Sequence, residues 1–213
     1  HKQWLYEGSI RVPLIVAGPG IGPDVVRDDL VSGIDITVST LAMTGAPIPD
    51  YVEGRNVFAE DYVAREFVVS ARDRCDYTID HVRAVTTKRF KYIRNFLTDR
   101  PFMQPQYRDP MDFMKVGRKL FQEGKLDAVQ ATIWSDDRPC EELYDLQEDP
   151  HEIRNLALNP VYATTLRDHQ NRLATWMQST NDQGQFPEPP ESLRGVLKRW
   201  SKQAVNPEFE LVK

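Results

Sequence analysis

His81-Val82-Arg83-Ala84-Val85-Thr86 and Phe90-Lys91-Tyr92-Ile93-Arg94-Asn95-Phe96 are two strand-like runs that lie close together in the sequence. The linker between them, Thr87-Lys88-Arg89, is short and polar, so the two runs are expected to pair as an antiparallel hairpin. In the second run, aromatic or aliphatic residues alternate with basic ones, a pattern typical of a sheet with one face in water. This hairpin predicts an antiparallel sheet at the centre of the chain.

Strand-like runs on either side of the hairpin extend the predicted sheet. One precedes it at residues 66–71, and another follows at residues 142–146, where Glu148-Asp149-Pro150 supplies a turn. Between the hairpin and the last strand, residues 97–140 form a long proline-containing excursion with one expected helix over residues 111–123. Insertions of this length are often functional.

Helical patterns follow the sheet. Asn159-Pro160 is a good helix start, because asparagine caps and proline suits the first helical position. The apolar or aromatic positions after it recur three and four residues apart, so one face of the helix is expected to be core: Tyr162, Leu166, His169, Leu173, Trp176 and Met177. Beyond residue 180 the chain is polar and rich in proline, with a short helix possible over residues 192–202.

The N-terminal region has a different sequence pattern. Residues 10–17 are rich in branched side chains and alternate little, which is typical of a strand covered on both faces in an α/β sheet. Gly18-Pro19-Gly20 ends this run. A short amphipathic helix is then expected over residues 34–43, stopped by Gly45 and Pro47.

Composition excludes several classes of protein. The chain has 27 basic and 32 acidic residues and a net charge of −5, so there is no basic excess for nucleic acid. Its longest apolar run, residues 12–17, is far shorter than the ~20 residues of a membrane span. Two cysteines, Cys75 and Cys140, exclude a disulfide-dense scaffold and a four-cysteine zinc cluster. We interpret both as structural, and one disulfide stays open.

Residues 2–20 resemble the segment that follows the metal-binding motif in type I, formylglycine-dependent sulfatases of the alkaline phosphatase superfamily. Further blocks resemble the same arylsulfatase-like family in the same order: residues 45–55, residues 72–95 and residues 142–157. The resemblance covers roughly residues 2–178. It implies an α/β fold in which residues 1–60 end an alkaline-phosphatase-like α/β sandwich domain. Residues 61–180 then form a small C-terminal α+β subdomain with an antiparallel sheet packed on a helix, and residues 181–213 form a polar tail.

The resemblance also implies a function. The parent protein is expected to be a sulfuric ester hydrolase that acts on a sulfated small molecule or a sulfated glycan. In that family a formylglycine nucleophile and a divalent metal, usually calcium (Ca2+), lie upstream of this block, so no metal ligand is assigned in this chain. The missing N-terminal catalytic portion is therefore an expected partner, and this chain alone is expected to be inactive.

Lys2 is the residue that the resemblance marks as catalytic, because the matching lysine of the family reaches the sulfate group. An ammonium there stabilises developing charge and can supply a proton. The alternative is a solvated lysine at a frayed terminus. Glu7 and Arg11 are candidates for a buried pair that supports the Lys2 segment, or for ordinary edge charges.

Arg72, Arg74 and His81 are the candidate substrate-binding residues, because they flank strand ends and guanidinium groups offer paired donors to sugar carboxylates and hydroxyls. The alternative is a set of surface ion pairs with Asp73, Asp76 and Asp80. His151 and His169 are interpreted as packing or capping residues. Two other functions stay open: a phosphonate monoester or phosphodiester hydrolase of the same superfamily, and a noncatalytic binding module.

Overall fold

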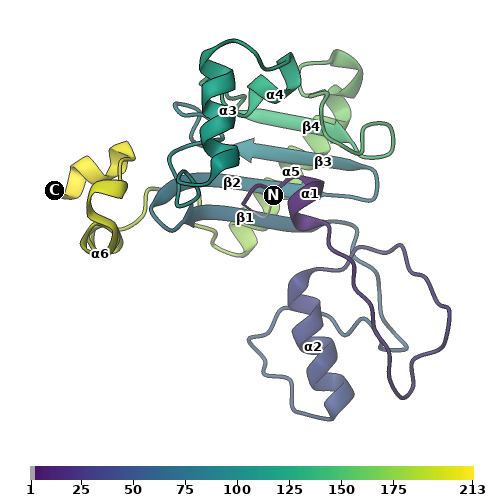
Figure 1. The fold of residues 1–213 in the computed structure, drawn as a ribbon. Helices are drawn as coiled ribbons and strands as arrows, with labels where there is room; N and C mark the ends of the chain where they lie inside the picture. Colours follow the sequence, from purple (N-terminus) through teal and green to yellow (C-terminus); the bar gives the residue numbers. More distant parts are fainter. Residues whose placement is uncertain (1–2) are drawn as a thin grey trace.

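A computed structural model describes residues 3–213, so Lys2 lies outside the described part of the chain. At its centre is a four-stranded antiparallel sheet in the order β1-β2-β3-β4 (Figure 1). The strands are β1 (Val68–Cys75), β2 (Thr78–Thr86), β3 (Phe90–Asn95) and β4 (Glu141–Asp145). The predicted hairpin and both flanking strands are confirmed.

The pairing of the edge strand β1 with β2 is interrupted near its end. Arg72 pairs with Val82 and Arg74 pairs with Ile79, so the register shifts between these two positions. Such an irregularity bends an edge strand and redirects its side chains. Asp73 stands at the shift, and the side chains around it belong to the site described below.

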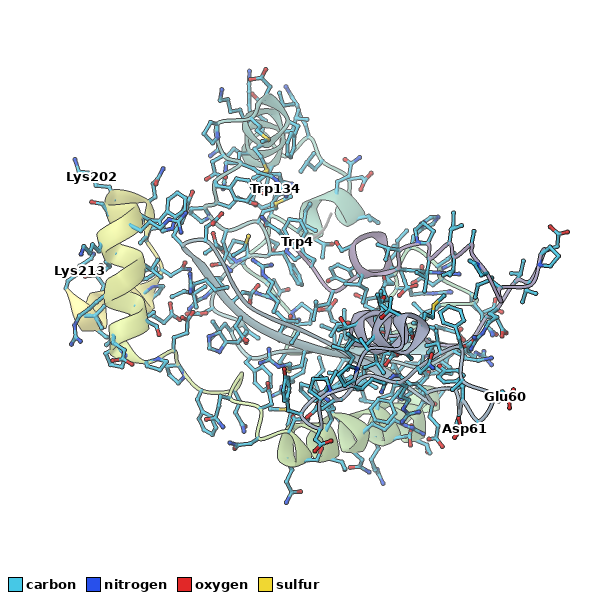
Figure 2. The ribbon with its side chains drawn as sticks, turned by 90° about the horizontal axis from the view of Figure 1, so that it is seen from below. Trp4, Glu60, Asp61, Trp134, Lys202 and Lys213 are labelled. Carbon is cyan, nitrogen blue, oxygen red and sulfur yellow. The ribbon has the colours of Figure 1, made fainter. Side chains whose placement is uncertain are left out.

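One face of the sheet packs on α5 (Ala163–Ser179), as predicted. The helix is entered through the 3-10 turn η1 (Pro160–Tyr162), where Asn159 Oδ1 accepts a hydrogen bond from the Val161 N–H. The core on this face includes Val85, Tyr92, Leu143 and Leu173. Figure 2 shows α5 beneath the sheet and α3 (Asp112–Gln122) on the opposite side.

The opposite face is covered by the N-terminal segment and α1 (Glu7–Ile10). Leu5 and Tyr6 pack there against Val82, Ala84, Ile93 and Tyr144. The excursion at 97–140 also carries α3, which matches the predicted helix, and α4 (Ala128–Thr132), which the sequence analysis did not anticipate. Asp127 and Gln130 form a capping box at the start of α4.

The prediction that β3 presents one face to water is wrong. Lys91 is fully buried, and its ammonium lies 2.7 Å from Glu7 and 2.9 Å from Glu152. The N-terminal segment covers this face and brings two carboxylates to the lysine. Basic residues in a strand indicate a side exposed to solvent only when no distant acid reaches them.

The predicted strand at residues 10–17 is also wrong. Residues 11–17 have no regular structure, and Val12 and Ile15 are 72% and 90% exposed. A strand forms by bonding to a neighbour, and this segment pairs with none of the strands within residues 3–213. Branched side chains alone were therefore not enough to predict a strand at this position.

Residues 11–66 form a lobe below the sheet, which we call the N-terminal lobe (Figure 1). Its helix α2 (Gly33–Thr44) confirms the prediction and ends at Gly45, which adopts the left-handed conformation with φ 69°. Asp35 is completely buried and accepts hydrogen bonds from Arg65 and from the backbone N–H groups of Ser32 and Arg55. A single bridge between Leu30 and Arg65 closes the lobe.

The C-terminal region forms a small cluster beside the sheet, with α6 (Pro190–Trp200), η2 (Ser201–Gln203) and η3 (Pro207–Val212) (Figure 1). Leu193, Val196 and the fully buried Phe209 pack on Tyr77 and Ile79. The short helix expected near residues 192–202 is thus present. Across residues 3–213, no helix is both long and apolar enough to cross a membrane.

Candidate functional site

A pocket of about 750 Å³ lies along the edge strand β1. Its walls are the N-terminal segment with Gln3 and Trp4, strand β1 itself, and residues 182–189, which we call the strap. The strap joins α5 to α6. The volume falls within the range of about 300–1,000 Å³ that is usual for small-molecule sites.

All three predicted substrate-binding residues, Arg72, Arg74 and His81, line this pocket. They reach it from different faces of the sheet. Arg72 pairs with Val82, whose side chain belongs to the core under the N-terminal segment, while His81 precedes Val82 in β2 and faces the opposite way. The pocket therefore wraps around the sheet edge.

Arg83, which sequence analysis did not single out, holds the strap against the sheet. Its side chain is 2% exposed and donates to Asp182 at 2.9 and 3.0 Å and to Asp73 at 2.7 Å. Burial acts to lower the pKa of Arg83, but the bonds to Asp182 and Asp73 outweigh it and leave this pKa raised. A Cβ at Gly184 would overlap the Arg83 guanidinium, so a larger residue there would force Arg83 to move.

Arg74 and His81 also bind the strap. Arg74 Nε donates to Glu188 at 2.9 Å, and its Nη1 donates to the Asp76 carbonyl at 2.6 Å. His81 is buried, and its Nδ1 lies 2.8 Å from the Gly184 carbonyl. A carbonyl only accepts, so Nδ1 carries the proton. The main donors of these two side chains are thus engaged within the protein.

Arg72 differs from its neighbours. It is 8% exposed, and its Nη1 lies 3.4 Å from Asp80 Oδ2. Asp80 is already bound by Arg138 through two hydrogen bonds of 2.9 and 3.2 Å. Among the described residues, neither Nε nor Nη1 of Arg72 has a hydrogen-bond partner. Burial lowers the pKa of Arg72, and the charge of Arg138 lowers it further against the opposing effect of Asp80. The ion pair with Asp80 that the alternative expected is therefore present, but it is buried and not at the surface.

Trp4 stands beside Arg72 and was not identified from the sequence. Its indole Nε1 is buried and has no hydrogen-bond partner within residues 3–213, and its ring centre lies 5.9 Å from Arg72 Cζ. Trp4 and Arg72 both line the pocket. Figure 2 shows Trp4 on the face of the sheet opposite α5. An aromatic residue two positions after Lys2 was the only available signal for this role.

The predicted Glu7 and Arg11 pair is not buried. Arg11 is exposed and lies 3.8 Å from Glu7, whereas Glu7 makes its shorter contact with Lys91. Cys75 and Cys140 are both free thiols. Within residues 3–213, no group of three or more His, Cys, Asp or Glu side chains is arranged to hold a metal ion.

Comparison with known proteins identifies the family. The model of the N-sulphoglucosamine sulphohydrolase C-terminal family matches residues 1–136. The chain belongs to this sulfatase family. The match includes the Lys2 block, the N-terminal lobe and the sheet through β3, so the predicted family is confirmed.

Relatives and solved structures agree with the family. An ulvan-active sulfatase of Formosa agariphila is 32% identical over 88% of this chain and 32% of its own length. The N-sulphoglucosamine sulphohydrolase of Homo sapiens is 28% identical over 84% of this chain and 38% of its length. The structure of BT1596, a 2-O GAG sulfatase, superposes with a TM-score of 0.53 at 22% identity, covering 78% of this chain and 29% of that one. This likeness confirms the sulfatase C-terminal fold. The chain spans about a third of the length of these curated relatives.

Proposed function

We propose that this sulfatase-family chain is the C-terminal part of an enzyme that hydrolyses sulfate esters of carbohydrates. The family match over residues 1–136 carries this proposal. Support for a sugar substrate comes from the pocket at β1, which has the size of a small-molecule site and is lined by arginine, histidine and tryptophan.

The nucleophile and the metal are assigned to the preceding part of the parent enzyme, as a formylglycine and a calcium ion. Calcium takes about 6–8 oxygen ligands from carboxylates and carbonyls. Residues 3–213 do not fit such a site, because no suitable cluster of three acidic, cysteine or histidine side chains forms among them. We therefore derive no step through the ion from this chain.

Lys2 is proposed to place its ammonium against a sulfate oxygen and to stabilise the charge that develops there. Gln3 and Trp4, which follow it directly, line the β1 pocket. Loss of one such stabilising group typically costs about 10²–10³ in kcat. Lys2→Ala in the parent enzyme is expected to lower kcat by this order, measured as sulfate release. Lys88→Ala, at an exposed position, is the matched control and should leave kcat unchanged.

Arg72, Arg74 and His81 are proposed to act together at the pocket, in two roles. Arg72 has unpaired donors for the substrate, while Arg74 and His81 hold the strap that forms the far wall. From the sequence alone, the three residues had the same expected role. Their different hydrogen bonding in the structure supports one role for Arg72 and another for Arg74 and His81.

Assays of the intact parent enzyme separate this proposal from its nearest rival, a phosphonate monoester or phosphodiester hydrolase. An aryl sulfate and an aryl phosphodiester with the same leaving group should be compared by kcat/KM. A preference for the sulfate is expected, and a preference for the phosphodiester would overturn the proposal. The purified chain alone should show no turnover, and metal-dependent turnover by it would contradict the upstream assignment of the nucleophile.

A further inference from the structure

The N-terminal segment and strand β1 bring together three buried N–H donors that make no hydrogen bond within residues 3–213: Trp4 Nε1, Arg72 Nε and Arg72 Nη1. Of these, only Arg72 Nη1 has a charged neighbour, Asp80 Oδ2 at 3.4 Å. We propose that Trp4 and Arg72 form an oxyanion subsite that binds one carboxylate or sulfate group of the sugar. This inference rests on the proposed function and names a substrate feature that the pocket selects.

The chemistry of the unpaired atoms points to an anion. A buried donor left unsatisfied costs about 1–3 kcal/mol, so native proteins rarely keep several together. All three atoms are donors and two of them belong to one guanidinium, a charged group that binds carboxylate and sulfate oxygens strongly. Water would satisfy one or two of them, but an oxyanion offers lone pairs to all three and also a compensating charge.

The unequal contacts of Arg72 and Arg138 favour the same conclusion. Arg72 and Arg138 share the single carboxylate of Asp80, and Arg138 holds it in the shorter, bidentate contact. The neighbouring carboxylate of Glu142 accepts hydrogen bonds from Tyr6, Tyr144 and Asn95. The two arginines are matched in number by two carboxylates, but Arg138 takes the bidentate contact with Asp80, so Arg72 keeps only one long contact to an acid. A bound oxyanion would supply the close acceptors that Arg72 lacks.

The rest of the pocket limits the ligand to one such group. The strap side carries Asp182 and Glu188, and Asp73 stands at the edge of β1; each of these carboxylates is held by Arg83 or Arg74. Because those arginines are already neutralised, that side offers acceptors for sugar hydroxyls and no free cation. A second anionic group there would meet like charge. The pocket therefore suits a sugar with one anion near Trp4 and hydroxyls toward the strap.

Kinetics of the intact parent enzyme test the subsite. Two substrates should be compared: a sulfated sugar linked to a uronic acid, and its uronate methyl ester, which lacks the second negative charge. Arg72→Gln is expected to raise KM for the free acid about tenfold or more, as lost charge-assisted hydrogen bonds predict, and to change the ester little. Equal effects on the two substrates would overturn recognition of a carboxylate.

Two further variants separate recognition from folding. Trp4→Phe removes the indole N–H and keeps the ring, so a smaller rise in KM, about threefold, is expected for the acid alone. Arg74→Gln is the matched control, because the Arg74 donors are engaged by Glu188 and Asp76, and it should not discriminate between acid and ester. If Arg74→Gln discriminates and Arg72→Gln does not, the subsite is misassigned.

A binding measurement on the 213-residue chain is independent of sulfate hydrolysis. The indole N–H resonance of Trp4, assigned by its loss in Trp4→Phe, should shift with sodium glucuronate or glucose 6-sulfate and stay in place with glucose. The stronger of the two responses identifies the source of the oxyanion. In Arg72→Lys the shift should shrink while the other indole resonances keep their positions. No response to either anion would overturn the subsite, whereas absence of sulfate release by the parent would overturn only the proposed function.

Discussion

A few buried ionised side chains determine how the N-terminal segment meets the sheet. Lys91 is fully buried between Glu7 of α1 and Glu152, which follows β4. Burial raises the pKa of Glu152, and the charge of Lys91 opposes this rise. The lysine thus allows two carboxylates to sit inside the protein, and it ties the segment carrying Trp4 to the sheet.

Replacing Lys91 by methionine should destabilise the chain strongly. The side chain keeps similar length, but Glu7 and Glu152 lose their shared cation and remain within the interior. Breaking a buried pair in this way typically costs about 3–5 kcal/mol. Urea unfolding should report a loss of this size for Lys91→Met. Lys88→Met, whose partner Asp28 is exposed, should change the unfolding free energy by less than about 1 kcal/mol.

Gly184→Ala should displace the strap from the pocket. A methyl group at this position would overlap the Arg83 guanidinium, so Arg83 must move and its bonds to Asp182 and Asp73 must weaken. Loss of one such network is expected to cost about 2 kcal/mol or more. Gly195→Ala in α6 is the matched control, since nothing lies within 4 Å of its added carbon, and it should stabilise the chain by about 0.5–1 kcal/mol. Equal effects on urea unfolding would contradict the role of Gly184.

The sequence could identify Arg72, Arg74 and His81 as neighbours, because all three lie in β1 and β2, which are adjacent in the sequence and pair directly. It could not show which of the three has hydrogen-bond donors left for a ligand. Which donors are free depends on Glu188 and Gly184, which reach the pocket only after α5 has crossed the sheet. The burial of Lys91 could not be predicted for the same reason, since its two acids, Glu7 and Glu152, lie far before and far after β3 in the sequence.

Helices and strands were predicted well where the sequence pattern of a segment and the partner that stabilises it lie close together in the sequence. The β2 and β3 runs are neighbours in sequence and pair directly, and α2 carries its own stop at Gly45. Residues 10–17 had the composition of a buried strand but no partner within the described chain. A strand-like sequence pattern shows that a segment is able to form a strand. The segment forms one only where a neighbouring strand is available to pair with it.

The helix α2 should lose its anchoring in acid. Burial alone would raise the pKa of Asp35, but hydrogen bonds from Arg65 and from the backbone of Ser32 and Arg55 outweigh it and hold this pKa below 3.8. A pKa lowered by folding means that the stabilisation is present above about 3.8 and is lost as the pH falls through the lower folded value. The α2 amide resonances should therefore collapse toward random-coil positions below about pH 3.8, before those of β2 and β3.

Asp35→Asn provides the corresponding variant at neutral pH. The amide cannot neutralise Arg65, so α2 should be disordered at pH 7 and its residual pH dependence should disappear. Asp50→Asn is the control, because Asp50 is exposed and lies in the same lobe. If α2 in the wild type unfolds at the same pH as β2 and β3, or if Asp50→Asn has the same effect as Asp35→Asn, the anchoring role of Asp35 is refuted.

The molecule as a whole divides into a well-packed sheet body and an N-terminal lobe with a thin connection to it. In Figure 1 the lobe projects away from the sheet and is joined by two chain segments. The ion pair between Lys88 and Asp28 links the two, and both side chains are largely exposed. Several large apolar side chains of the lobe lie in solvent: Val12, Ile15, Val25, Val26, Tyr51 and Val63.

This uneven packing predicts the order of cleavage by thermolysin, which cuts beside large apolar residues. In the isolated chain, the first cuts should fall within residues 11–32, where Ile15 and Val26 are 90% and 95% exposed, while the sheet body persists. Regions with few buried contacts open at low free energy. In the intact parent, the same sites should be protected, because exposed apolar patches of this kind mark interaction surfaces and the preceding catalytic portion is the expected partner. Mass spectrometry of the early fragments provides the measurement. First cuts within β2 or β3, or equal cleavage of the lobe in the chain and in the parent, would contradict the prediction that residues 1–60 complete the large catalytic domain.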